Sequence, residues 1–313
     1  MRPGACLALL LALGCTRAAD IRADLRRDPR RGAHIDDVPF VAQQPDTCGA
    51  AALASVLLHA GLPASEPALA TALRTRQAHG ALTYELVVEA RRQGALAAQR
   101  YDVTAEDLRR ALDAGVAPIV LRGGLANALL GVFHYSVLTA YDRERAVWIG
   151  HDGEAADVLF TDADLEADRR RANRWALFVV GPAARPTGLP PGVHLELGVQ
   201  AEQTAHPDAA AHHYAQAAWT PASAQALLNL ANLALAADDL PRAELLLRAA
   251  LTAEPGSAAA RNNLAWTLLK QGRHLDEAAN LAAAAAEDPD IRTSALDTLA
   301  QIRAAQGQPE GEP

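Results

Sequence analysis

The C-terminal part of the chain repeats with a fixed period of 34 residues. The repeat is marked by three prolines and a recurring tripeptide: Pro221, Pro255 and Pro289, and Asn229-Leu230-Ala231, which returns as Asn263-Leu264-Ala265. This period is typical of stacked helix pairs, because each repeat can bury its apolar face only against its neighbours. We therefore predict an all-α helical solenoid over residues 193–307 and a disordered tail over residues 308–313.

Counting back from Pro255 assigns the small and apolar residues of one repeat to two helices. The first carries Leu227, Leu230, Ala231 and Ala234, and the second carries Ala243, Leu247 and Ala250. The pattern resembles that of tetratricopeptide (TPR) repeats, which implies recruitment of a protein partner. Residues 195–221 are expected to form a degenerate first repeat and residues 295–305 a final partial helix pair. An unrelated alanine-rich helical bundle is the alternative.

Residues 35–183 precede the repeats, and their hydrophobic pattern changes along the segment. Helix-period stretches come first, and short runs rich in Val, Tyr, Trp and Phe follow. The expected helices cover residues 48–60, 66–74, 84–92 and 105–114, and the expected strands cover 117–121, 134–141, 146–150 and 175–180. Helices followed by an antiparallel sheet indicate an α+β domain. Prolines between positions 182 and 191 predict a linker over residues 184–192.

The first 15 residues have the composition of a bacterial export signal. The apolar run from Cys6 to Gly14 is too short to span a bilayer, which takes about 20 residues. Ala12-Leu13-Gly14-Cys15 resembles a lipoprotein processing site, so we expect an acylated Cys15 that anchors the chain to the outer membrane from the periplasm. Cleavage without lipidation is the alternative. Residues 16–34 are rich in Arg and Asp, which predicts a tether.

Charge and cysteine content exclude several function classes. The net charge is −8 and the arginines form only short groups, so nucleic-acid binding is not expected. Two of the three cysteines, Cys6 and Cys15, belong to the signal, so a disulfide framework is not expected either. We expect no cofactor and no metal ion. His212 and His213 are predicted to lie on a solvated surface, because adjacent side chains on a helix diverge by about 100°.

Cys48 lies at a loop-to-helix junction, where a nucleophile is expected. The backbone N–H groups and the dipole at a helix start stabilise a thiolate and lower the pKa of the thiol. Gly49 is expected to leave space for a substrate carbonyl. Gln43 is expected to hold an oxyanion with its side-chain amide, together with the Cys48 backbone N–H. Gln44 is the competing candidate for this role, and a buried structural cysteine is the alternative for Cys48.

A cysteine nucleophile also needs a histidine base that a third group orients. His134 opens a predicted strand. If this strand and the next form a hairpin with its loop near Arg143, position 134 lies opposite position 152, which brings Asp152 beside His134. Asp142 lies at the turn, about 26 Å of strand away, and is excluded. His151 is expected to point to the opposite face or into the loop and to be structural.

Together, these residues resemble the bacteriocin-processing (double-glycine leader) type of papain-like cysteine peptidase. The resemblance rests on Gln43, Cys48-Gly49-Ala50-Ala51, His134-Tyr135 and Asp152, and covers roughly residues 35–183. It implies a Cys48–His134 catalytic pair oriented by Asp152, with Gln43 at the oxyanion hole. It also implies cleavage of peptides after small residues, often Gly-Gly or Gly-Ala.

These inferences predict an exported cysteine peptidase in the bacterial cell envelope, whose TPR repeats recruit a protein substrate or partner. The alternative is a catalytically silent peptidase-like domain that binds peptides and serves, with the repeats, as an envelope scaffold. Acyl transfer on the same triad is a related chemistry that the sequence does not separate from hydrolysis.

Overall fold

The structure is a computed structural model that describes residues 17–73, 81–124, 133–218 and 223–307. The predicted signal peptide with Cys6 and Cys15, the repeat proline Pro221 and the predicted tail lie outside the described residues. The chain forms two compact units, with the boundary between Leu189 and Pro190. In the described part of the chain, no helix is both long and apolar enough to cross a membrane.

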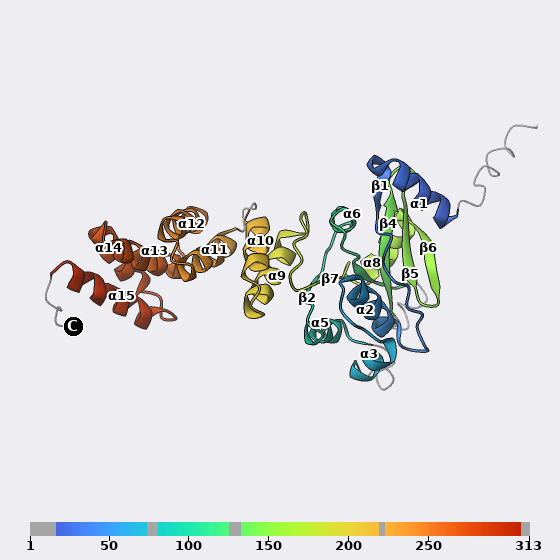
Figure 1. The fold of residues 1–313 in the computed structure, drawn as a ribbon, viewed down its shortest axis with the longest axis horizontal. Coiled ribbons are helices and arrows are strands. Elements are labelled where there is room, and N and C mark those ends of the chain that lie inside the picture. The colour runs from blue at the N-terminus through green and yellow to red at the C-terminus, as the bar shows by residue number, and fades with distance from the viewer. Residues whose placement is uncertain (1–16, 74–80, 125–132, 219–222, 308–313) are drawn as a thin grey trace, which may run out of the picture. The chain divides into compact units, whose positions relative to one another are not determined.

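The first unit is built on one seven-stranded sheet (Figure 1). The spatial order is β2-β7-β3-β4-β5-β6, with β1 paired to β4, and all pairs are antiparallel. The strands are β1 (Gly32–His34), β2 (Leu96–Arg100), β3 (Ile119–Arg122), β4 (His134–Asp142), β5 (Val147–Asp152), β6 (Ala155–Thr161) and β7 (Ala176–Val180). The prediction of helices with an antiparallel sheet is confirmed, and β3, β4, β5 and β7 lie where strands were expected.

The described helices of this unit pack on the sheet and on one another. They are α1 (Ala18–Arg27), α2 (Cys48–His59), α3 (Glu66–Ala72), α5 (Thr83–Arg92), α6 (Ala105–Asp113) and α8 (Asp162–Arg171). The four expected helices correspond to α2, α3, α5 and α6. The central helix is α2, because its residues from Gly49 to Leu57 are all buried and it contacts β3, β4 and β7.

The two faces of β4 meet different helices. Tyr135 and Ser136 are adjacent, so their side chains point to opposite faces of the sheet. Gly49 of α2 lies against the Tyr135 ring. Arg122 donates to Ser136 on the other face, and also to Asp168 of α8. The start of β4 is therefore reached from one face by the N-terminus of α2 and from the other by α8.

The N-terminal segment differs from the expected tether. α1 buries Ile21 and Leu25 against the sheet, and β1 extends the sheet beside β4. Arg22 is buried as well, and its guanidinium donates to Asp157 and Thr139. The high charge of this segment therefore does not indicate disorder, because part of the charge is paired within the fold.

The second unit contains only helices among its described residues. They are α9 (Pro191–Gln203), α10 (Pro207–Ala217), α11 (Ala224–Ala236), α12 (Leu240–Ala253), α13 (Ala258–Gln271), α14 (Leu275–Ala285) and α15 (Arg292–Ala305). α9 packs on α10, α11 on α12, and α13 on α14. α9 begins inside the predicted linker, since a proline such as Pro191 suits the first position of a helix.

The core of this unit uses the residues that define the repeat. Ala231 and Ala265 occupy equivalent places in the 34-residue period, and both are fully buried in one cluster with Leu247. Asn263 donates to Asn232 at 2.8 Å, which links α13 to α11. These contacts describe paired helices, and the TPR assignment stays a prediction.

His213 is not on a solvated surface as predicted. It is fully buried, and its Nδ1 lies 3.0 Å from Nδ1 of His194 in α9. The prediction failed because α10 packs on α9, which turns His213 inward while His212 stays partly exposed. Within the described ranges, no group of three or more His, Cys, Asp or Glu side chains could hold a metal ion.

Candidate active site

Cys48 is the first residue of α2, and its side chain is partly exposed. The loop before it is held by Thr47, which is fully buried. The Thr47 hydroxyl accepts the Gln44 N–H at 2.8 Å and donates to the Gln44 carbonyl at 3.0 Å. Asp46 turns the chain with a φ of +66°. The structure thus places the thiol at a helix N-terminus, as the sequence predicts, and anchors the loop that leads to it.

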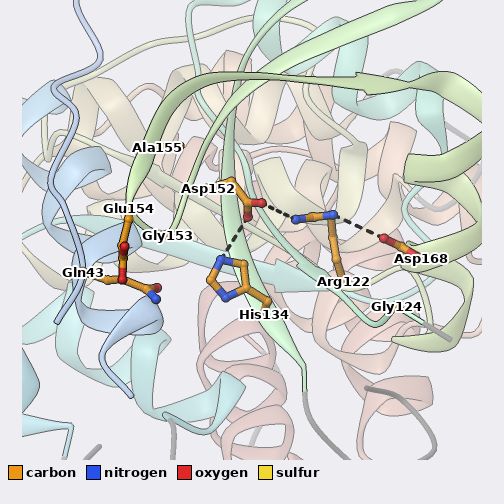
Figure 2. A pocket seen from close by; sticks show the side chains of 9 residues that line it. All are labelled: Gln43, Arg122, Gly124, His134, Asp152, Gly153, Glu154, Ala155 and Asp168. Carbon is orange, nitrogen blue, oxygen red and sulfur yellow. Dashed lines mark hydrogen bonds and ion pairs between the residues drawn. The ribbon is translucent and has the colours of Figure 1, made fainter. Parts of the chain in front are cut away.

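His134 begins β4, and its Nε2 lies 2.9 Å from Oδ1 of Asp152 at the end of β5 (Figure 2). The predicted register is wrong, since Asp152 pairs with Ser136. The hairpin loop lies between Asp142 and Val147, so its centre comes later in the chain than expected. The pairing then shifts again at a bulge in β4, between Leu138 and Ala140. Asp152 still reaches His134, because positions 134 and 136 share a face and diagonal neighbours can touch. Nδ1 is left as the ring nitrogen available to Cys48.

The environment favours a thiolate beside an imidazolium. Burial raises the pKa of Cys48, but hydrogen bonds from the His134 side chain and from the backbone N–H groups of Tyr135 and Gly49 outweigh it and lower that pKa. Burial also lowers the pKa of His134, but Asp152 and Cys48 outweigh it and raise that pKa to about 9. Each group therefore stabilises the charged form of the other.

Two residues that the sequence analysis missed contact the Asp152 carboxylate, and a third, Asp168, contacts one of them. Oδ1 accepts a hydrogen bond from the Ser136 hydroxyl at 2.6 Å, and Oδ2 accepts one from Arg122 at 2.7 Å. Asp168 accepts from Arg122 at 3.2 Å. Burial raises the pKa of Asp152, but His134, Arg122 and Ser136 outweigh it and hold that pKa well below its usual range. The sequence signal that could have identified Arg122 was its position at the end of an apolar strand.

Gln43 lies beside the turn between β5 and β6. Its backbone N–H donates to the Gly153 carbonyl at 3.2 Å. Gly153 has a φ of +64°, and a Cβ there would lie 3.3 Å from the Gln43 amide carbon, so both backbone and space favour glycine. Gln43 lines a small cavity with Cys48 and a larger one with His134. Gln44 is exposed and lines neither cavity, so the geometry favours Gln43 over Gln44.

Two neighbours of the site have packing roles. Gly49 is buried, and a Cβ there would lie 2.9 Å from the Cβ of Ala81, so the packing of α2 requires glycine independently of any substrate. His151 is buried on the face opposite Asp152. Its Nε2 lies 3.0 Å from the Val38 carbonyl oxygen, and its ring packs edge-on against Phe40.

A cavity of about 460 Å³ opens beside His134 and Asp152 (Figure 2). Its volume lies in the range of sites that bind small ligands. The lining is mostly polar and comprises Gln43, Arg122, Gly124, His134, Asp152, Gly153, Glu154, Ala155 and Asp168. The histidine and its carboxylate are therefore accessible from outside the fold.

Replacing Gln43 by alanine tests its expected place at an oxyanion hole. The variant should lose about 100-fold to 1,000-fold in kcat, because one donor to the developing oxyanion is removed. KM should change little. The measurement is steady-state hydrolysis of a fluorogenic peptide, with Gln44→Ala as the matched control because Gln44 lies next in the chain and outside both cavities. An equal loss in both variants would refute the assignment of Gln43.

Comparison with known proteins finds a family match within the first unit. Residues 35–172 match the Peptidase_C39 like family, so the chain contains a Peptidase_C39-like domain. The peptidase domain of Streptococcus ComA, a bifunctional ABC transporter involved in quorum sensing, is 19% identical; the match covers 46% of this chain and 98% of that one, with a TM-score of 0.38. A C39-like peptidase from Bacillus anthracis is 16% identical, covering 47% and 96%, with a TM-score of 0.40. No curated protein matches the sequence.

Proposed function

We propose that the chain is a cysteine peptidase that hydrolyses peptide bonds through Cys48, His134 and Asp152, with Gln43 at the oxyanion hole. The observation that carries the proposal is the 2.9 Å contact between His134 Nε2 and Asp152, which leaves Nδ1 for the hydrogen bond between His134 and Cys48 at the helix start. The Peptidase_C39-like match of residues 35–172 supports the same chemistry.

In the first half of the reaction, the Cys48 thiolate attacks the carbonyl carbon of the scissile bond. The carbonyl oxygen becomes an oxyanion, which the Gln43 amide and the Cys48 backbone N–H stabilise. His134, already an imidazolium, donates its Nδ1 proton to the leaving amine. The C–N bond breaks, the amine product departs, and the acyl group remains on Cys48 as a thioester.

In the second half, neutral His134 acts as a base towards water. It accepts a proton from the water molecule while the oxygen adds to the thioester carbonyl. The C–S bond then breaks, the carboxylic acid product leaves, and the thiolate and imidazolium are restored. Asp152 holds the ring in one orientation through both halves.

The proposal extends to the place of action and to the second unit. An acylated Cys15 would hold the enzyme at the outer membrane on the periplasmic side, and the helix pairs of residues 193–307, as TPR repeats, would recruit a protein substrate or partner. The 34-residue period supports the repeat assignment. Placing a photo-cross-linking amino acid at the exposed position of Leu245 in α12 would test recruitment of an envelope protein.

The pH dependence of Cys48 alkylation tests the proposed chemistry. We expect iodoacetamide to react with Cys48 well below the pH near 8.5 at which an ordinary thiol ionises. The imidazolium should persist until the pH approaches about 9, the pKa of His134. Hydrolysis should then follow a bell whose alkaline limb lies near that value.

Peptide mapping after alkylation locates the label, and the urea-unfolded chain is the matched control, since its Cys48 lacks a partner. A native midpoint equal to that of the unfolded chain would refute the thiolate–imidazolium pair. It would favour the silent, peptide-binding scaffold instead.

A further inference from the structure

Arg122 contacts the Asp152 carboxylate of the candidate site. It ends β3 directly opposite His134 in the β3–β4 ladder. Its Nη2 donates to Asp152 at 2.7 Å, its Nε donates to the Ser136 hydroxyl at 2.8 Å, and its Nη1 donates to Asp168 at 3.2 Å. Figure 2 shows the resulting chain from His134 through Asp152 and Arg122 to Asp168.

Three hydrogen-bond acceptors and an aromatic ring restrain the Arg122 guanidinium. Its side chain is 12% exposed, and its central carbon lies 4.4 Å from the centroid of the Phe160 ring. A planar guanidinium that donates in three directions has little freedom to rotate. Since Ser136 donates to Oδ1 of Asp152 while Arg122 donates to Oδ2, the two contacts together fix the plane of the carboxylate.

We propose that Arg122 is a positioning residue for the reaction, which orients the His134 ring by fixing the carboxylate of Asp152. The inference rests on the proposed function. A carboxylate at the end of a strand could otherwise turn about its side-chain bonds, and a misplacement of about 1 Å can cost about 100-fold in rate. Arg122 contacts Oδ2 of Asp152 while His134 contacts Oδ1, so Arg122 acts on the histidine through that carboxylate.

The other charges near the pair belong to several elements. Cys48 lies on α2, Glu154 lines the cavity from the β5–β6 turn, and Asp168 lies on α8, where it also accepts from Arg171 at 2.8 Å. Removing the cation at position 122 therefore leaves carboxylates around the pair. A thiolate becomes harder to form and an imidazolium harder to deprotonate, so both limbs of the pH profile should move to higher pH.

The test compares three variants of the full chain. Arg122→Met removes the charge and the hydrogen bonds, and Arg122→Lys keeps the charge without the planar fork. Arg109→Met is the matched control, because Arg109 also has a salt bridge (3.2 Å to Asp162) and packs on a ring (4.2 Å from the Tyr141 centroid), while lining neither cavity at the site. The readouts are the pH profile of iodoacetamide alkylation at Cys48, hydrolysis of a fluorogenic peptide amide carrying Gly-Gly before the scissile bond, and thermal unfolding.

Arg122→Met should lower kcat by about tenfold to 100-fold with little change in KM, and should move the alkylation midpoint to higher pH. Arg122→Lys should return the midpoint towards wild type while restoring only part of kcat. Arg109→Met should lower the unfolding temperature and leave the pH profile in place. A folded Arg122→Met with the wild-type profile, or an equal shift in Arg109→Met, would overturn the inference. An ordinary thiol midpoint in the wild-type chain would instead refute the proposed function itself.

Discussion

Peptide hydrolysis should disappear when Cys48 is replaced by alanine, with a loss of at least about 10⁴-fold in kcat. Removal of the nucleophile leaves only binding and oxyanion stabilisation, which accelerate the reaction far less than the complete triad. Among the residues that the structure describes, Cys48 is the one free cysteine. The assay is cleavage of a fluorogenic peptide by the purified chain, with thermal unfolding to show that the variant is folded.

The same variant also tests whether the proposed proteolysis takes place in the cell envelope. In cells that carry Cys48→Ala, envelope proteins should lack a set of new N-termini that follow small residues and that appear with the wild-type chain. The matched control is His59→Gln, because His59 lies at the other end of the same helix and lines neither cavity at the site. Identical envelope N-termini with wild type and Cys48→Ala would remove the support for proteolysis in the envelope.

The second large effect is expected at His134. His134→Ala should lower kcat by about 10⁴-fold, since it removes the proton donor for the leaving amine and the base for water. The pKa of Cys48 should rise, because burial then raises it without the opposing contact from His134. Alkylation of Cys48 by iodoacetamide should accordingly require a higher pH than in the wild-type chain.

A histidine at the opposite end of the same helix provides the control. His59 ends α2, and its Nε2 lies 2.9 Å from the Gly115 carbonyl oxygen, far along the helix from Cys48. His59→Gln should leave both the rate of hydrolysis and the alkylation profile unchanged. If His134→Ala kept the low alkylation midpoint of the wild type, the helix start alone would account for the reactivity of Cys48 and the histidine would have no part in it.

The candidate site could be predicted largely because its members occupy ends of elements. A cysteine at a helix start and a histidine at a strand start are visible in a single sequence. Asp152 was found although the predicted register was wrong, because a face of a strand repeats every two residues. Ser136, which pairs with Asp152 in the sheet, and His134, which was predicted to, therefore lie on the same face of β4. Asp152 contacts both side chains.

The parts that could not be predicted depend on partners distant in sequence. α1 shows few apolar residues, and its buried Arg22 depends on partners distant in sequence, Thr139 and Asp157, the latter 135 residues later. α8 buries a single apolar residue, Leu165, along with Arg169, so it has no helical periodicity to detect. Arg122 was missed for the same reason, since its role depends on contacts to Asp152 and Asp168 that only the folded sheet creates.

Under the proposed lipidation, the docking of α1 on the sheet would shorten the connection between the membrane and the first unit. If Cys15 carries the lipid, only Thr16 and Arg17 separate the anchor from the first residue of α1, Ala18. Two residues extend at most about 7 Å, which is about the thickness of one lipid headgroup layer. With so short a connection, the proposed lipidated enzyme would act on substrates at the membrane surface.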